Sequence, residues 1–369
     1  MIIGIDGNEA NVRNRVGVGR YAFELLKQFN ELRINNYEFS IYLKNKPLDD
    51  LPKETSWWKY KVISPRKFWT QMGLPFNLFF DKPRPDIFFT PTHYAPRFCP
   101  CPGVISIMDL SFLYFPAMFK KSDLWQLTNW TAYSVKKATM ILAISQASKD
   151  DIIKYYGVDE KKVMVTYPGY NPQNMKHGTL NINEKYGIEG DYILSVGTLQ
   201  PRKNYIKLIE AFSTLNPNPY TLVIVGKKGW MFADILAAPK KFKVENKVKF
   251  LDYVPDEDMP ALYQNAKCFI LISLYEGFGL PVLEAMNYGC PVIVSNASSL
   301  PEVVGDAGIL VDPNKTDEIK NKLITIFNLS AEERENIIQK GKIQASKFSW
   351  EKCAIETLNV LKELGAKNV

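Results

Sequence analysis

The feature that most constrains this chain is an alternation between short apolar runs and longer stretches with apolar residues at helical spacing. Strands that alternate with helices form a parallel sheet covered on both faces. The sequence therefore predicts an α/β fold of the doubly wound, Rossmann-like kind. In the first half of the 369-residue chain the apolar runs are 2–5, 39–43, 86–90, 103–107 and 140–145.

The alternation stops near residues 168–190 and then starts again. We predict two doubly wound domains, residues 1–170 and 171–349, with a last helical segment over 350–369. Ligands bind at the carboxyl ends of parallel strands, so a nucleotide or sugar-nucleotide site is expected in a cleft between the domains. The apolar runs of the second half are 192–197, 221–226, 248–251, 268–271 and 291–294.

Composition excludes several other classes of protein. With 46% hydrophobic and 23% charged residues the chain is not expected to be disordered. It starts without a basic segment followed by an apolar one, and it contains no apolar run of about 18 residues, so neither a secretory signal nor a membrane-spanning helix is predicted. Five cysteines, an odd number, fit a reducing, cytoplasmic compartment, and only two histidines argue against a four-ligand zinc site.

The net charge of +7 lies entirely in the first domain. One stretch of that domain, residues 57–69, mixes lysine and arginine with three tryptophans. One interpretation is contact with an anionic membrane surface or a phosphorylated acceptor. The other, which we favour from the sequence, is a packed edge element with a solvated charged face.

Two carboxylates eight positions apart, Glu276 and Glu284, form the first motif with chemical content. Gly277 and Gly279 between them let the backbone approach a ligand, and the helix start that follows favours a phosphate. Glu284, expected in the first helical turn, suits the vicinal hydroxyls of a ribose, and Glu276 suits hydroxyls of a second sugar. The alternative is an ordinary helix N-terminus with favourable acidic residues.

Two adjacent cations, Arg202 and Lys203, form the second motif. They follow the first strand of the second domain, in a strand-to-helix loop that begins at Gly197. A diphosphate leaving group needs such neutralisation when no metal is present. The alternative is a solvated helix start, although positive charge there opposes the helix dipole.

Taken together, these residues resemble the family-4 retaining glycosyltransferases of the GT-B fold. The resemblance spans nearly the whole chain and rests on VGTLQPRKN, VGKKGW, LDYVPDEDMPALY, SLYEGFGLPVLEAMNYGCPVIVSNASSLPEVVGDAGILVDP and FSWEKCA. It implies transfer of a hexose, of mannose, rhamnose or glucose type, from a GDP-, UDP-, ADP- or dTDP-sugar to a glycan or lipid-linked saccharide. It further implies surface polysaccharide synthesis with retained anomeric configuration, without a metal or other cofactor, at the inner face of the cell membrane.

The resemblance also implies a role for each site residue. Arg202 and Lys203 would hold the diphosphate, Glu284 the ribose, and Glu276 with Gly277, Phe278 and Gly279 the hexose; Leu280, Gly197 and Thr198 would complete the donor site, with Tyr253 and Val254 beside the base. From the first domain, Gly17 and Gly19 would approach the phosphates of the donor or the acceptor, and Asp109 would bind an acceptor hydroxyl. The final helix would pack back on the first domain.

The sequence departs from the family pattern at Met108, where a histidine is common, and at Thr198, where many members have arginine. His93 follows the preceding strand, and we expect a structural role for it more than a place in the cleft. Asp256 and Asp258 form a D-x-D pair, which we interpret as a helix N-cap and not as a metal site. Two alternatives therefore stay open: a non-catalytic nucleotide-sugar-binding relative, and another enzyme of the same fold such as an epimerase or a pyridoxal-phosphate-dependent phosphorylase.

Overall fold

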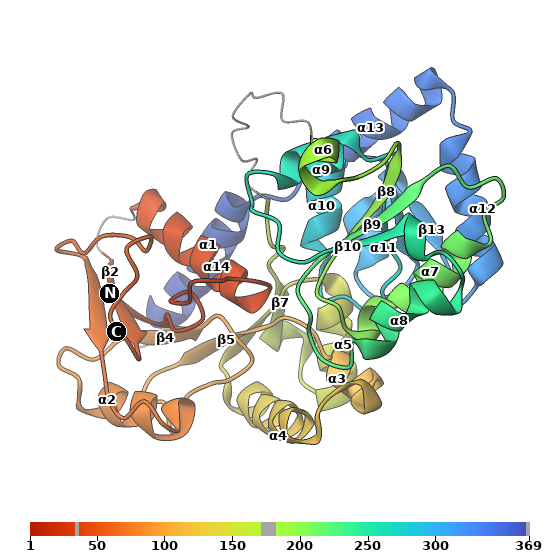
Figure 1. Cartoon of the computed structure of the whole chain (residues 1–369). Helices are drawn as coiled ribbons and strands as arrows, with labels where there is room; N and C mark the ends of the chain where they lie inside the picture. Colours follow the sequence, from red (N-terminus) through yellow and green to blue (C-terminus); the bar gives the residue numbers. More distant parts are fainter. Residues whose placement is uncertain (34–36, 171–181, 367–369) are drawn as a thin grey trace. The chain divides into compact units, whose positions relative to one another are not determined.

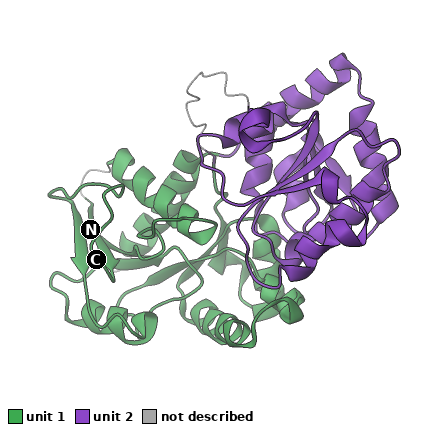
Figure 2. Cartoon of the chain, in the orientation of Figure 1, with its two compact units in different colours: residues 1–169, 349–369 green, residues 170–348 purple. Residues whose placement is uncertain are grey.

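The computed structural model describes residues 1–33, 37–170 and 182–366. The chain forms two compact units, residues 1–169 with 349–369 and residues 170–348 (Figure 2). These limits lie one residue from the predicted domain limits. Residues 171–181, within the predicted break, and the last three of the predicted final helix lie outside the described part.

Unit 1 contains a seven-stranded parallel sheet with the order β3-β2-β1-β4-β5-β6-β7. The order reverses between β1 and β4, which pair with each other in parallel. Such a reversal is the point at which doubly wound sheets bind ligands. The strands are β1 (Ile2–Asp6), β2 (Glu38–Leu43), β3 (Trp58–Val62), β4 (Ile87–Thr90), β5 (Gly103–Ile107), β6 (Met140–Ala143) and β7 (Val163–Val165).

Helices cover both faces of this sheet (Figure 1). On one face lie α1 (Val18–Leu32) and α14 (Trp350–Ala366), and the rings of Tyr21 and Trp350 meet edge to face at 6.0 Å. On the other face lie α2 (Leu74–Phe80), which continues the π-helical turn η1 (Trp69–Gly73), and α4 (Lys121–Lys137). The remaining elements are α3 (Ser111–Tyr114), η2 (Pro116–Met118), α5 (Gln146–Tyr156) and η3 (Glu160–Lys162).

Unit 2 repeats the plan with a six-stranded parallel sheet of order β10-β9-β8-β11-β12-β13. Here the order reverses between the paired strands β8 and β11. The strands are β8 (Tyr192–Val196), β9 (Thr221–Val225), β10 (Val248–Leu251), β11 (Cys268–Leu271), β12 (Val292–Ser295) and β13 (Ile309–Val311).

One face of this sheet shares a core with the apolar sides of α7, α8 and α12. On it, Leu208, Phe212 and Leu323 are almost completely buried. Their burial removes large apolar surfaces from water, which is the main stabilising term of such a layer. The helical elements of the unit are α6 (Ile182–Tyr186), η4 (Pro201–Lys203), α7 (Tyr205–Ser213), α8 (Ala233–Lys241), η5 (Glu245–Lys247), α9 (Met259–Asn265), α10 (Leu280–Asn287), α11 (Leu300–Val304), η6 (Gly305–Ala307), α12 (Thr316–Phe327) and α13 (Ala331–Ala345).

All ten predicted apolar runs are strands, which confirms the predicted alternation. The sequence did not predict β7 and β13, which have three residues each, or define β3 as a strand. Within 57–69, β3 is the edge strand of its sheet, and Trp58 and Trp69 are buried. The packed-edge interpretation is therefore right for these two tryptophans.

Candidate active site

The loop after β8 carries the two predicted cations and depends on glycine. A Cβ atom on Gly197 would lie 3.1 Å from Cε of Lys203, so the missing side chain lets the lysine cross over the strand end. A Cβ atom on Gly226, after β9, would lie 2.1 Å from the carbonyl oxygen of Gly197. Both glycines thus allow the loops at this end of the sheet to pack backbone against backbone.

The neighbours Arg202 and Lys203 meet Glu276, which lies 74 and 73 positions further along the chain, in one cluster. Lys203 Nζ lies 2.6 Å from Glu276 Oε1, and Arg202 Nη1 lies 3.3 Å from Oε2. Arg202 Nη1 also donates to the carbonyl oxygen of Tyr275. Glu276 and Lys203 are only 7% and 9% exposed, so the cluster is largely shielded from water.

The charges of this cluster decide the ionisation of Glu276. Burial raises the pKa of the carboxyl group, but the charges of Lys203 and Arg202 and the hydrogen bond from Lys203 outweigh burial and lower the pKa to about 2. Glu276 is therefore ionised, and two cations with one anion leave a net charge of +1.

The cluster lies at the reversal point of the unit 2 sheet. Lys203 belongs to the loop after β8, Glu276 follows β11, and these two strands are neighbours in the sheet. Both loops leave the carboxyl ends of their strands, where open α/β sheets bind ligands. The strand order and the charge of the cluster thus both indicate a ligand site at the carboxyl ends of β8 and β11.

The segment from Glu276 to Gly279 is held by a serine of the loop after β12. Ser299 Oγ donates to the carbonyl oxygens of Glu276 (2.9 Å) and Phe278 (3.0 Å). Gly279, with a φ of 111°, is the N-cap of α10. Over the described residues, the main-chain N–H groups of Gly277 and Gly279 donate no hydrogen bond. Free amides at a helix N-terminus are suited to binding an anion.

Glu284 lies one turn further into α10 than predicted. Because Gly279 caps the helix, α10 begins at Leu280, and Glu284 is its fifth residue; the expectation of a first-turn carboxylate was wrong. Its Oε2 accepts a hydrogen bond of 2.8 Å from the hydroxyl of Tyr263. Burial, followed by the nearby Glu284 charge, raises the pKa of Tyr263, so this hydroxyl stays protonated and keeps donating to Glu284.

The other predicted donor residues of unit 2 follow β10 and β8 of the same sheet. Tyr253, after β10, is 58% exposed, with Lys227 Nζ 4.8 Å from its ring centroid, and Val254 beside it is buried. Thr198 packs closely against Gly229, where a Cβ atom would lie 2.7 Å from the Thr198 methyl group.

The predicted residues of unit 1 follow β1 and β5. Gly17 is the exposed N-cap of α1, and a Cβ atom on Gly19 would lie 3.0 Å from the carbonyl oxygen of Glu9. Asp109 Oδ1 accepts hydrogen bonds from the amide (2.9 Å) and hydroxyl (2.6 Å) of Ser111.

His93 lies against the position where the family commonly has its histidine. Its Nε2 accepts a hydrogen bond of 3.0 Å from the amide of Met108, so the ring proton is on Nδ1. Burial lowers the pKa of His93, and the nearby Asp109 charge only partly offsets this effect, so the ring is neutral. The sequence placed His93 after a neighbouring strand but did not predict this contact.

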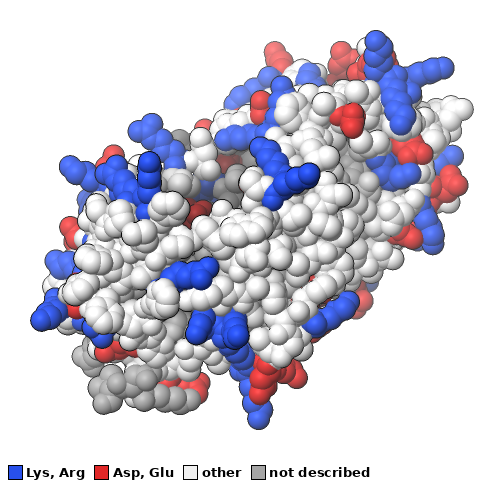
Figure 3. Space-filling view, turned by 90° about the horizontal axis from the view of Figure 1, so that it is seen from below, with Lys and Arg blue, Asp and Glu red and all other residues white. Residues whose placement is uncertain are grey.

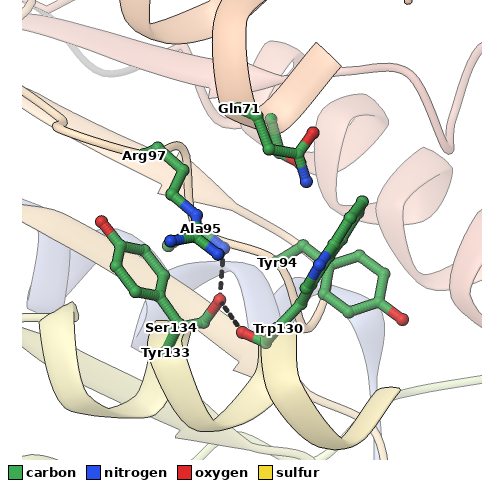
Figure 4. Close-up of a pocket in the computed structure, with 8 residues that line it drawn as sticks. Gln71, Tyr94, Ala95, Arg97, Trp130, Tyr133 and Ser134 are labelled. Atoms are coloured by element: carbon green, nitrogen blue, oxygen red, sulfur yellow. Dashed lines mark hydrogen bonds between the residues drawn. The ribbon is translucent and has the colours of Figure 1, made fainter. Parts of the chain in front are cut away.

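A shallow pocket of unit 1 brings together residues that the sequence did not single out (Figure 4). The Arg97 guanidinium stacks on the ring of Tyr133 at 4.1 Å, and Tyr94 meets Trp130 edge to face at 5.5 Å. Figure 4 shows the Gln71 amide facing the same space. The lining residues come from η1, the loop after β4 and α4, so no local pattern could have revealed them; they are Thr70, Gln71, Tyr94, Ala95, Arg97, Trp130, Tyr133 and Ser134.

The D-x-D pair behaves differently from the prediction. Asp258 occupies the N-cap position of α9, but its side chain makes no capping hydrogen bond. It is 1% exposed and pairs with Lys185 at 2.6 Å, so a distant cation competes successfully with the helix amides. In the part of the chain that the structure describes, no three His, Cys, Asp or Glu residues are grouped to hold a metal ion, and no helix is long and apolar enough to cross a membrane.

Comparison with known proteins identifies the family. Residues 16–174 match the model for Glycosyltransferase Family 4, and residues 180–344 match the model for Glycosyl transferases group 1. The chain is 35% identical over 270 residues to O-antigen chain mannosyltransferase B of Escherichia coli. The matched region covers 71% of this chain and 70% of the relative.

Solved structures show the same fold. Sucrose-phosphate synthase from Thermosynechococcus elongatus superposes with a TM-score of 0.79 at 16% identity, covering 99% of both chains. HepE from Anabaena, solved in complex with UDP-glucose, superposes with a TM-score of 0.76 at 19% identity, covering 98% of this chain and 99% of HepE. The chain thus belongs to the family-4 glycosyltransferases of the GT-B fold and is a hexosyltransferase.

Proposed function

We propose that this enzyme transfers mannose from a nucleoside-diphosphate sugar to a glycan or lipid-linked saccharide during surface polysaccharide synthesis, with retention and without a metal. The observation that carries the proposal is the cluster of Arg202, Lys203 and Glu276 at the reversal point of the unit 2 sheet. The choice of mannose is supported by the relative named O-antigen chain mannosyltransferase B.

The diphosphate of the donor binds at the two cations. The ammonium group of Lys203 has three N–H donors, so it can keep its hydrogen bond to Glu276 while it also donates to a phosphate oxygen. The amides of Gly277 and Gly279 add partial positive charge at the start of α10. This set neutralises the charge that develops on the departing diphosphate, which is the role a metal ion has in other transferases.

The carboxylates of Glu284 and Glu276 bind the two sugars of the donor. Glu284, oriented by the Tyr263 hydroxyl, accepts hydrogen bonds from the ribose hydroxyls. Glu276 is kept ionised by its cations and accepts hydrogen bonds from hydroxyls of the hexose. The exposed ring of Tyr253 lies beside the base.

The pocket of Figure 4 binds one portion of the acceptor. Its aromatic rings suit the apolar faces of a saccharide, and the Arg97 guanidinium suits a phosphate or a ring hydroxyl. Asp109, fixed by Ser111, accepts a hydrogen bond from an acceptor hydroxyl.

Transfer then proceeds on one face of the donor sugar. The acceptor oxygen forms a bond to the anomeric carbon as the bond to the diphosphate oxygen breaks, and a diphosphate oxygen takes the acceptor proton. The protein contributes orientation and electrostatic stabilisation of the leaving charge.

A second candidate function is nucleotide-sugar binding without transfer. It is favoured by Met108, which replaces the histidine common in the family, and by His93, whose Nε2 is occupied by the Met108 amide.

Incubation of the enzyme with GDP-mannose or UDP-glucose, with EDTA and a panel of mannosyl acceptors, separates the two candidates. If the enzyme transfers mannose with retention, the α-linked donor GDP-mannose should give an α-linked mannoside in the presence of EDTA. The anomeric configuration of the product is identified by its one-bond C1–H1 coupling constant. Donor binding with no release of sugar to any acceptor or to water would instead support the second candidate.

A further inference from the structure

A ridge of exposed apolar side chains runs along η1 and α2. Its members, named here the η1–α2 patch, are Phe68, Met72, Phe76, Phe79 and Phe80, with exposed fractions of 66%, 56%, 61%, 57% and 63%. The rings of Phe76 and Phe80 lie 4.8 Å apart and those of Phe79 and Phe80 5.5 Å apart. The three rings on α2 therefore form one continuous apolar surface.

The fold does not need these side chains, because the opposite side of the segment anchors it. Trp69 Nε1 donates to Asp6 Oδ2 at 3.0 Å, at the end of β1. Leu74 and Leu78 are fully buried and belong to the same small core as Phe88. A surface helix normally presents polar residues to water, so a helix that is apolar on its outer face indicates a partner.

Positive charge surrounds the patch. Arg66, Lys67, Lys82 and Arg84 are all exposed, and Asp81, the only acidic residue between positions 64 and 84, is paired with Lys61. The Arg84 guanidinium lies over the Phe79 ring, 5.3 Å from its centroid, so one cation directly adjoins the group of three rings. Seen from below, the face formed by α2 and α4 is broadly uncharged, with Lys and Arg mostly around it (Figure 3).

We propose that the η1–α2 patch docks unit 1 on an anionic lipid bilayer. The phenylalanines enter the boundary between headgroups and acyl chains, and the flanking cations meet the lipid phosphates. A second copy of the chain is a poorer occupant, since a two-fold interface would bring the same four cations of each copy face to face.

This docking deepens the proposed function, in which a lipid-linked saccharide is one of the acceptors. Thr70 and Gln71, which line the pocket of Figure 4, lie between Phe68 and Met72 in η1. Phe98, 83% exposed, follows Arg97, whose amide donates to the Thr70 carbonyl at 2.7 Å. The pocket is therefore beside the docking surface, at the level of the lipid headgroups.

Vesicle flotation of the full chain tests the proposal. We expect binding to vesicles of phosphatidylcholine with about a third phosphatidylglycerol, weaker binding to phosphatidylcholine alone, and loss of the difference at high salt. Joint replacement Phe76→Ser, Phe79→Ser and Phe80→Ser should lower the partition coefficient about tenfold or more. Joint replacement Arg66→Gln, Lys67→Gln and Lys82→Gln should lower binding only to the anionic vesicles.

The matched control replaces three exposed apolar residues elsewhere, Met231→Ser, Ile343→Ser and Ile355→Ser, and should bind as the wild type does. Wild-type protein that does not float, or a phenylalanine variant that floats as well as the control, would overturn the proposal. Sedimentation velocity tests whether a second copy of the chain occupies the patch instead. If the wild type is a dimer and the phenylalanine variant is a monomer that still floats with vesicles, the patch is a protein interface.

Donor turnover with a water-soluble acceptor is measured on the same variants. The phenylalanine variant should keep wild-type turnover, because none of its changes touches the candidate active site. Wild-type protein that turns over the donor but does not float would contradict the docking surface alone, whereas wild-type protein that floats but does not turn over the donor would contradict the proposed function alone.

Discussion

Glu276 makes the stability of unit 2 depend on pH. Its pKa falls from an ordinary value of 4.5 to about 2 in the folded chain. A folded pKa below the unfolded one stabilises the fold above the unfolded value, and this stability is lost as the pH falls toward 2. A shift of about 2.5 pH units corresponds to about 3 kcal/mol at pH 7, of which less than half remains at pH 3.

Glu276→Gln removes this contribution and leaves Lys203 and Arg202 without their carboxylate. We expect unit 2 to lose about 3 kcal/mol of unfolding free energy at pH 7, and the difference from wild type to narrow to about 1 kcal/mol at pH 3. Because the chain has two units, one melting curve does not isolate the effect. Pulse proteolysis in urea, followed through peptides that contain Cys268–Leu271 of β11, reports on unit 2 alone.

Glu257→Gln is the control, because this carboxylate lies in the same unit and is exposed. It should change the unfolding free energy by less than about 0.5 kcal/mol at each pH. A Glu276→Gln difference that stays constant from pH 7 to pH 3 would refute the ion-pair reasoning, and so would a loss below about 1 kcal/mol at pH 7.

Three further substitutions test the site. Lys203→Met should lower kcat a hundredfold to a thousandfold, about the effect of removing one donor to a developing charge; wild-type kcat in a steady-state assay would exclude the diphosphate role. Glu284→Ala should raise the donor KM about tenfold with little change in kcat, and an unchanged KM argues against the ribose contact. Gly226→Ala places a Cβ atom 2.1 Å from the Gly197 carbonyl and should destabilise unit 2 by about 2 kcal/mol or more in urea, whereas Gly103→Ala, with open space around its Cβ position, should be nearly neutral.

The layout of both sheets could be predicted because it follows from local patterns. The apolar run 248–251 is β10 to the residue, and the run 192–197 is β8 with one residue fewer. The strand order then puts the loops of Lys203 and Glu276 at one edge, which is why two motifs far apart in the sequence meet.

Other features depend on contacts that local patterns do not contain. Asp258 sits at a helix N-cap, yet its side chain pairs with Lys185, 73 positions away. The outer face of α2 is apolar where the helical pattern predicts polar residues, so Phe76 and its neighbours would be assigned to a core from the sequence alone. The pocket around Arg97 combines three separate segments, and its existence depends on where α4 packs.

Calorimetric titration of nucleotides tests the central claim most directly. Wild-type protein should bind GDP or UDP far more tightly than the corresponding nucleoside, and Lys203→Met should lose about tenfold or more in affinity for the diphosphate with unchanged affinity for the nucleoside. Equal affinity for diphosphate and nucleoside in the wild type, or equal losses for both ligands in the variant, would contradict a diphosphate site at Arg202, Lys203 and Glu276.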